Sequence, residues 1–331
     1  MRLTLAIPRL LLLDRAALSA LPALGALAHY ARHGETSAGD IDVIVASGEV
    51  PDVALPVAPL AALGAGFDPG RAYVLRADPI SLVAGRDDVL LTGRVDDLEA
   101  DAAGALVATL NAHFAGDGLV FHVPRPDAWF VTVRESPALA TSPLSSVRGA
   151  IHRHLPTGDD AGRWRRWMSE MQMLLHNHPV GRAREERGQT PVTGIWLSGG
   201  GALPQAPRGT PSAVFAGDGP AGDVARGRAR FQGRAAATLP PNFSMLPVRE
   251  DALVVLGTIT STDAANAVAD AWIAPAVRAL ERGDIAALRF LADGAGHVAS
   301  WRADRPKLAT RLRGRFARPV FVPPEFPDDD E

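Results

Sequence analysis

The sequence lacks cysteine entirely and contains a single lysine, Lys307, among its 331 residues. Without cysteine there are no disulfides, thiolate metal ligands or cysteine nucleophiles, so any metal would need histidine, aspartate or glutamate. The shortage of lysine, set against 34 lysine and arginine residues in total, indicates a compositional bias rather than an arginine-specific binding role. No apolar run reaches the roughly 18 residues of a membrane span, which predicts a soluble, cytoplasmic protein that does not bind membranes.

The sequence also has no excess of basic residues over acidic ones. The formal net charge is −3, and a protein that binds nucleic acid needs a basic surface to neutralise phosphates, so nucleic acid is not expected as a partner. The chain is 47% hydrophobic and 21% charged, which is typical of a folded globular protein. Its length suffices for one large domain or for a core that carries an inserted second domain.

The most strongly patterned stretch runs from Trp164 to Gly201. Its first part repeats apolar residues at three- and four-residue spacing, which predicts an α-helix that ends before Pro179. Gly194–Ser198 follows as an expected buried strand, and the glycine triplet Gly199–Gly201 comes directly after it. Such a triplet is either a permissive loop, the commoner case, or a backbone cradle for an anion.

Strand and helix patterns alternate after residue 190, which predicts an α/β fold with a doubly wound, mostly parallel sheet. Ala252–Ile259 is the expected central strand, and Asp42–Ala46 is expected to be another buried strand. Residues 1–55 and 136–331 are assigned to this core, and residues 56–135 to an inserted α+β domain of short strands around one helix. Pro306–Phe316 is expected to form a final basic helix.

Candidate catalytic carboxylates lie at or just after strand candidates, where α/β folds concentrate functional groups. They are Asp14, Asp263 and Asp293, with His297 nearby in sequence. This set is too small for a two-metal phosphoryl-transfer site, which uses more carboxylate and imidazole ligands. The alternative interpretation is that these aspartates cap helices.

Histidine and arginine clusters carry further alternatives. His152 with His154, and His176 with His178, have a spacing that brings two imidazoles together only on a strand. The second pair lies at the end of the expected helix, where capping by His176 and a packed turn at His178–Pro179 are favoured over metal binding. The cluster Arg226, Arg228, Arg230 and Arg234 spreads over more than one helix face, which favours a solvated surface over a phosphate clamp.

The patterned stretch, taken whole, resembles the archaeal-type 2,3-bisphosphoglycerate-independent phosphoglycerate mutases of the alkaline phosphatase superfamily. The matching positions are His178–Val180, Arg184, Gly188, Pro191, Ile195, Leu197, Gly199 and Gly201. Gly181 and Thr193 replace two asparagines of the family pattern, and Ser198 replaces an arginine. In the expected inserted domain, Arg76 and the turn Gly93–Arg94 also match family motifs.

The resemblance implies an alkaline-phosphatase-like fold and, in the family, two divalent metals such as manganese or zinc beside a serine nucleophile. This chain departs from the family's ligand motifs. Asp14 is followed by arginine rather than glycine, and Asp263 and Asp293 lack the neighbouring histidines. We therefore expect no metal cofactor, with two bound metals as the alternative, because each metal site needs a set number of donors.

We therefore expect a mutase-like protein without metal-dependent catalysis that senses a small phosphorylated metabolite or binds a protein partner or another copy of itself. The expected ligand-binding residues are His178, Arg184, Ser198, Gly199, Gly200 and Gly201. Two alternatives stay open: an active, divergent mutase or phosphatase, and a structural subunit without a small ligand.

Overall fold

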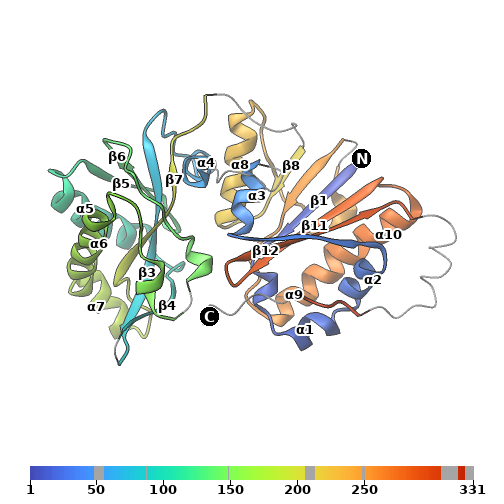
Figure 1. Cartoon of the computed structure of the whole chain (residues 1–331), viewed down its shortest axis with the longest axis horizontal. Coiled ribbons are helices and arrows are strands. Elements are labelled where there is room, and N and C mark those ends of the chain that lie inside the picture. Colours follow the sequence, from blue (N-terminus) through green and yellow to red (C-terminus); the bar gives the residue numbers. More distant parts are fainter. Residues whose placement is uncertain are drawn as a thin grey trace. The chain divides into compact units, whose positions relative to one another are not determined.

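The computed structural model describes residues 1–47, 56–86, 88–147, 149–205, 213–247, 250–306 and 320–324. The chain divides into two compact units, Met1–Val50 with Gly209–Glu331 as the first unit and Pro51–Arg208 as the second (Figure 1). The first unit contains a mostly parallel sheet and the second a separate antiparallel sheet. The predicted α/β class with a mostly parallel sheet is confirmed.

The sheet of the first unit has the strand order β2-β12-β11-β1-β10-β8-β9. Neighbouring strands from β11 to β9 are parallel, whereas β12 and β2 add two antiparallel strands at one edge. The strand bounds are β1 Arg2–Ile7, β2 Arg32–Ala38, β8 Ala213–Ala216, β9 Ala237–Thr238, β10 Ala252–Val255, β11 Ala287–Gly294 and β12 His297–Asp304. β10 is a central strand, as predicted for the apolar run that begins at Ala252.

Helices cover both faces of this sheet, with α3 and α8 on one face and α1, α2, α9 and α10 on the other (Figure 1). Their bounds are α1 Arg15–Ala20, α2 Pro22–Tyr30, α3 Ile41–Ser47, α8 Pro220–Phe231, α9 Thr262–Val268 and α10 Ala274–Arg282. A π-helical turn, Ala269–Ile273, joins α9 to α10. Pro275 follows it, and its missing N–H explains why regular α-helical hydrogen bonding is interrupted there.

The expected strand Asp42–Ala46 is wrong, because this run lies in helix α3. A short apolar run cannot be assigned to strand or helix by periodicity alone. At the start of this helix, the Asp293 carboxylate accepts a hydrogen bond from the backbone N–H of Ile41 at 3.2 Å. The expected basic helix Pro306–Phe316 lies outside the described residues, apart from Pro306 itself.

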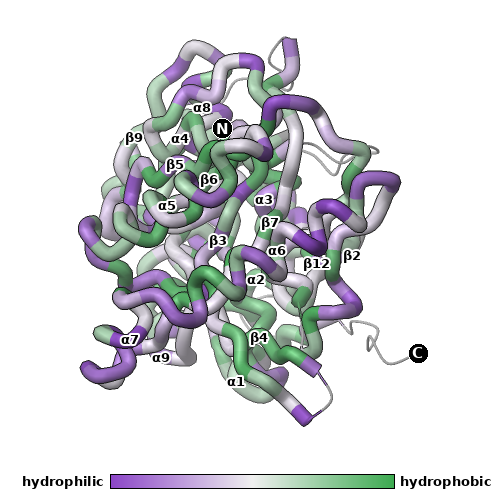
Figure 2. The backbone as a smooth tube through the Cα atoms, turned by 90° about the vertical axis from the view of Figure 1, so that its left-hand side faces the viewer, coloured by the Kyte–Doolittle hydropathy of each residue, from purple (hydrophilic) through white to green (hydrophobic). Residues whose placement is uncertain are grey.

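The second unit contains an antiparallel sheet around β3, Tyr73–Ala84. β3 pairs with β4, β6 and β7, and β5 pairs with β6. The other strands are β4 Val89–Arg94, β5 Leu119–Arg125, β6 Ala128–Val133 and β7 Gly194–Gly201. The helices are α4 Val57–Gly64, α5 Ala100–Phe114, α6 Ala161–His176 and the mostly hydrophilic α7 Pro179–Glu186 (Figure 2).

The expected boundary at residue 135 differs from the structure, because α6 and β7 belong to the second unit and not to the parallel core. β7 pairs antiparallel with β3, with Ser198 opposite Arg76 and Gly194 opposite Ile80. The apolar stripe of α6 buries Trp164 and Met171 in the same core cluster as α5. A long-range strand pairing of this kind leaves no mark in local sequence periodicity.

Within the described part of the chain, no helix is both long enough and apolar enough to cross a membrane. The helix α6 itself, predicted from its periodicity, is confirmed with sixteen residues.

Trp164 provides a test of how α6 is anchored. Its side chain is fully buried, and its indole N–H has no hydrogen-bond partner within the described residues. We expect Trp164→Ala to lower the free energy of unfolding by about 3–5 kcal/mol, because it leaves a large cavity. Trp164→Phe should cost only about 1 kcal/mol, because it also removes an unpaired buried donor. Urea unfolding of the two variants measures the difference, and equal losses would contradict this packing.

Candidate functional site

The carboxyl ends of β11, β1 and β10 lie side by side in the first unit, since Ile7 pairs with Ala292 and Ala6 with Val255. Asp293 stands at this edge and is buried. One of its carboxylate oxygens, Oδ1, accepts the backbone N–H of Arg9 at 2.6 Å, and Oδ2 accepts that of Ile41. Burial raises the pKa of Asp293 to about 6 against these hydrogen bonds, and the nearby Asp42 charge adds to the rise.

The other expected carboxylates do not join Asp293 in a metal site. Asp14 caps α1, where its Oδ1 accepts the backbone N–H of Ala17 at 2.7 Å. Asp263 is exposed in the first turn of α9, and His297 bonds the carbonyl of Ala295 at 3.0 Å. No group of three or more histidine and acidic side chains in the described ranges is placed to hold a metal ion. These residues do not fit the paired-metal site that the sequence resemblance implies.

His178 and Arg184 have structural partners in the second unit. Nδ1 of His178 accepts the backbone N–H of Val180 at 3.2 Å and caps α7, so the ring proton lies on Nε2, which donates to Thr109 Oγ1 at 3.0 Å. Burial lowers the pKa of His178, which favours this neutral form. Arg184 is buried and donates from Nε to the carbonyl of Thr190 at 2.8 Å and from its guanidinium to Asp97. A ligand could engage either side chain only by sharing or breaking these bonds.

The glycine triplet continues β7 beside β3 and against α4. A Cβ atom added at Gly199 would lie 2.5 Å from Val57 Cγ2, and one at Gly201 would lie 2.2 Å from Pro56 Cβ. Gly199 also has a φ of 66°, which disfavours any side chain. Close packing therefore requires glycine at these positions, whether or not an anion binds. Ser198, just before the triplet, is buried in the strand.

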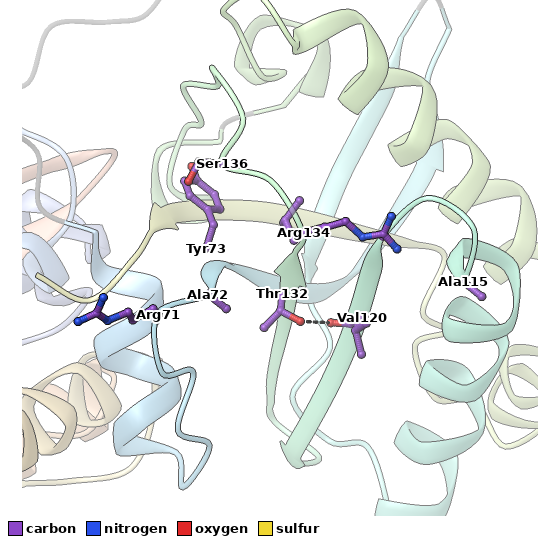
Figure 3. Close-up of a pocket in the computed structure, with 10 residues that line it drawn as sticks. Arg71, Ala72, Tyr73, Ala115, Val120, Thr132, Arg134 and Ser136 are labelled. Atoms are coloured by element: carbon purple, nitrogen blue, oxygen red, sulfur yellow. Dashed lines mark hydrogen bonds between the residues drawn. The ribbon is translucent and has the colours of Figure 1, made fainter.

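Gly200 connects the triplet to a cavity of about 450 Å³ at the start of β3 (Figure 3). A Cβ at Gly200 would lie 2.5 Å from the Tyr73 hydroxyl, so glycine there leaves room for Tyr73. We call this cavity the Tyr73 pocket; it is lined by Arg71, Ala72, Tyr73, Ala115, Gly118, Val120, Thr132, Val133, Arg134 and Ser136. None of these lining residues is acidic, and two are arginines, so the pocket has a positive charge.

The side chains of the Tyr73 pocket suit an anion. Burial raises the pKa of Tyr73, which keeps its hydroxyl protonated and able to donate a hydrogen bond. Arg71 and Arg134 are exposed on either side of Tyr73, with their guanidinium groups directed away from each other (Figure 3). Exposed arginine side chains change rotamer rapidly, so both can turn toward a bound anion.

The Tyr73 pocket was missed in the sequence. Arg71 and Arg134 are far apart in the chain, and only the antiparallel pairing of Tyr73 with Val133 brings them to one place. Short strands were expected in this part of the chain, but their partners and register were not, because both are set by long-range contacts.

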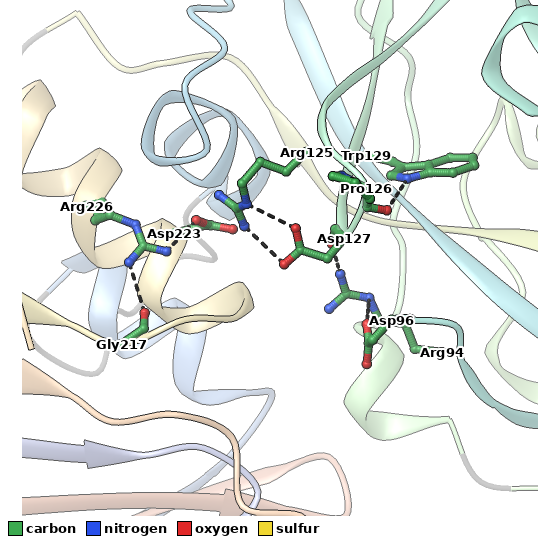
Figure 4. Close-up of polar contacts among 9 residues, drawn as sticks. All are labelled: Arg94, Asp96, Arg125, Pro126, Asp127, Trp129, Gly217, Asp223 and Arg226. Atoms are coloured by element: carbon green, nitrogen blue, oxygen red, sulfur yellow. Dashed lines mark hydrogen bonds and ion pairs between the residues drawn. The ribbon is translucent and has the colours of Figure 1, made fainter. Parts of the chain in front are cut away.

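A second polar cluster contains Arg94, one of the family-matched residues (Figure 4). Its Nε lies 3.1 Å from both Asp78 Oδ1 and Asp96 Oδ1, and its guanidinium donates to the carbonyl of Asp127. Arg125 binds the Asp127 carboxylate through two hydrogen bonds of 3.0 and 3.2 Å. Burial pushes the pKa of Asp127 upward, but the Arg125 hydrogen bond and charge outweigh it and lower the pKa overall. Because three aspartates face two arginines, this cluster has no surplus positive charge for an anion.

The arginines of α8 are not a uniform solvated surface, contrary to expectation. Arg228 is buried and donates to the carbonyl of Val45, near the carboxyl end of α3, at 3.1 Å. Arg226 donates to Asp223 Oδ1 at 2.7 Å and to the carbonyl of Gly217 at 2.9 Å (Figure 4). Both side chains tie α8 to neighbouring elements of the first unit.

Comparison with known proteins finds no matching family model. A 2,3-bisphosphoglycerate-independent phosphoglycerate mutase from Methanothrix thermoacetophila is 41% identical over 71 residues, which are 22% of this chain and 18% of that protein. The protein named 2,3-bisphosphoglycerate-independent phosphoglycerate mutase 2 from Methanothermobacter thermautotrophicus is 28% identical over 158 residues, covering 42% of this chain and 39% of that one. The matches thus span less than half the length of either relative.

Among solved structures, a cofactor-independent phosphoglycerate mutase from Thermoplasma acidophilum is similar over 94% of both chains, with 16% identity and a TM-score of 0.41. A Pyrococcus horikoshii protein is similar over 94% of this chain and 92% of its own, with 14% identity and a TM-score of 0.48. The sequence matches confirm the predicted resemblance to archaeal-type phosphoglycerate mutases, and this chain is phosphoglycerate-mutase-like.

The pKa of Asp293 predicts a pH-dependent stability. Between about pH 4 and pH 6 the folded protein keeps a proton that the unfolded chain releases, so this group's stabilising effect is full below pH 4 and is lost as pH rises through 6. The loss is on the order of 3 kcal/mol for a shift of this size. In Asp293→Asn the free energy of unfolding, measured in urea from pH 4 to 7, should change less with pH. Asp14→Asn, which keeps a helix cap, should leave the parent's slope unchanged; equal slopes in all three proteins would contradict the assignment.

The packing of the glycine triplet predicts that Gly199→Ala lowers the melting temperature, because the new Cβ overlaps Val57 and the residue has positive φ. The matched control is Gly104→Ala within α5, where a Cβ meets no atom within 4 Å. That control should raise stability by up to about 1 kcal/mol, since alanine favours helix over glycine. A Gly199→Ala protein as stable as the parent would show that the triplet is not constrained by α4.

Proposed function

We propose that this phosphoglycerate-mutase-like chain binds a small phosphorylated metabolite at the Tyr73 pocket and acts as a sensor without metal-dependent catalysis. One observation carries the proposal: a cavity of about 450 Å³ with two arginines, a protonated tyrosine and no acidic lining residue lies directly beside the glycine triplet. Exposed arginines at a concave site attract phosphate, and two of them can contact one phosphoryl group through charge-assisted hydrogen bonds.

The alternative polar site at Arg94 supports phosphate binding less well. Its arginines are already paired with carboxylates, so an anion would have to displace them or remain close to their negative charge. The Tyr73 pocket requires no such displacement, because no acidic side chain lines it alongside Arg71 and Arg134. Arg184 is likewise engaged by Asp97 and Thr190.

The class of ligand is suggested by the relatives, whose names include phosphoglycerate mutase. A three-carbon phosphorylated acid carries two anionic ends, which suits two arginines on either side of a tyrosine. The proposal that catalysis is absent is supported by the positions of Asp14, Asp263 and Asp293. Two of these carboxylates accept backbone hydrogen bonds, at different helix starts, and the third is exposed.

Thermal melting tests the ligand. With 3-phosphoglycerate at tenfold its dissociation constant, the parent should gain about 1.4 kcal/mol and melt a few degrees higher, because the ligand stabilises only the state that binds it. The double variant Arg71→Gln, Arg134→Gln should lose this shift while it keeps the parent's melting temperature without ligand. Gly200→Ala is a poorer choice, since its Cβ would displace Tyr73 and change the fold locally.

The matched control is Arg182→Gln, an exposed arginine of α7 outside the pocket, which should retain the shift. The ligand proposal is overturned if the melting temperature of the parent changes with neither 3-phosphoglycerate nor inorganic phosphate at millimolar concentration. Formation of 2-phosphoglycerate from 3-phosphoglycerate in the presence of Mn²⁺ would overturn the non-catalytic part and favour an active mutase.

A further inference from the structure

A second cavity, of about 580 Å³, lies at the other end of β3, between α6, the β3–β4 hairpin and the start of β7. Its inner wall is apolar: Ile80, Ile195 and Trp196 are each at most 2% exposed. Met168 of α6 and Leu82 of β3 extend this wall toward the surface. We call it the Trp196 pocket, and its volume is within the range that holds small organic molecules.

The indole N–H of Trp196 is not available for a hydrogen bond to a ligand. The indole N–H of Trp196 donates to the carbonyl of Ser142 at 3.0 Å, so its only polar atom is already engaged. The neighbouring side chains Ile80, Ile195, Leu82 and Met168 have no N–H or O–H group. This part of the cavity therefore favours an apolar body and disfavours a sugar acid with many hydroxyl groups.

Polar side chains gather at the rim. Arg165 donates from Nε to the carbonyl of Pro156 at 2.9 Å, which orients its guanidinium beside the pocket. Arg86 is exposed at the hairpin side. The one acidic lining residue, Asp88, lies 2.9 Å from His152 Nδ1. Among the lining residues, the two arginines face this single carboxylate, so the lining side chains have a positive formal charge.

We propose that the Trp196 pocket binds a small amphipathic organic monoanion, with an apolar body against Trp196 and an anionic group at Arg165 and Arg86. This site is independent of the Tyr73 pocket and shares no lining residue with it. Asp88 at the rim adds a repulsive charge that disfavours a dianion such as a phosphorylated acid relative to a monoanion. The pocket thus selects a different class of ligand from the one proposed above.

The probe 8-anilinonaphthalene-1-sulfonate, which has an aromatic body and one sulfonate, tests the proposal in the full chain. Its fluorescence should rise on binding and saturate at one equivalent. Arg165→Gln should weaken binding about tenfold, the effect of losing one charge-assisted contact. Met168→Glu should abolish it, because a carboxylate then enters the apolar wall.

Matched controls lie on the same helix. Arg166→Gln and Met173→Glu change the same residue types at positions outside the pocket, Met173 being 66% exposed, and should leave the affinity unchanged. Circular dichroism and a cooperative melt establish that each variant is folded before binding is measured. Equal weakening by Arg165→Gln and Arg166→Gln, or binding of several equivalents without saturation, would overturn the proposal.

Competition separates this site from the proposed function. If 3-phosphoglycerate displaces the probe, or if the Arg71→Gln, Arg134→Gln variant loses the probe, the Trp196 pocket is not the binding site and the inference fails. If the probe binds as expected while 3-phosphoglycerate gives no thermal shift, the inference stands and the proposed function fails.

Discussion

The second unit depends on hydrogen bonding along both edges of β3. This strand pairs with β6 near Tyr73, with β4 from Ile80 onward, and with β7 between Val74 and Ile80. Because the strand runs for twelve residues without a break, its two ends lie far apart on the sheet. Asp78–Pro79, a pair of residue types common in turns, is extended in this strand. Pro79 has no N–H to contribute, and its carbonyl accepts the N–H of Val95 at 2.9 Å.

This arrangement explains why the two cavities differ in chemistry. The Tyr73 pocket lies where β3 begins and β6 ends, and its arginines come from the segments just outside those strands. The Trp196 pocket lies where β3 passes β7 under α6, so core side chains form its wall. One strand thus presents a polar site at one end and an apolar site at the other, consistent with ligands of different classes.

In the first unit, the buried carboxylate of Asp293 connects the parallel sheet to a helix. Asp293 accepts backbone N–H groups from the segment after β1 and from the start of α3, and so joins the parallel sheet to a helix on its face. A carboxylate committed to two backbone donors in a buried position has limited capacity for a metal ion. This use of Asp293 separates the chain from the ligand pattern that its resemblance to phosphoglycerate mutases implies, although that resemblance is confirmed in sequence.

Local patterns sufficed for much of the fold. The apolar stripe from Trp164 to Leu175 specified α6, the β-branched run at Ala252 specified a central parallel strand, and Asp14 was a helix cap, as one interpretation allowed. Each of these depends on neighbours in the chain, through helical spacing, strand length or a cap three residues away.

Other features were decided only by tertiary structure. The segment at Ile41 is a helix, and its first N–H is bound by Asp293, about 250 residues away, a contact that local periodicity does not predict. β7 joined the antiparallel sheet because its register with β3 buries Trp196 and Leu197. The glycine triplet shows the same division. The sequence alone determined that its backbone carries no side chains. Only the tertiary packing, which places atoms of Pro56, Val57 and Tyr73 within 3 Å of where a Cβ would lie, decided that larger residues do not fit there.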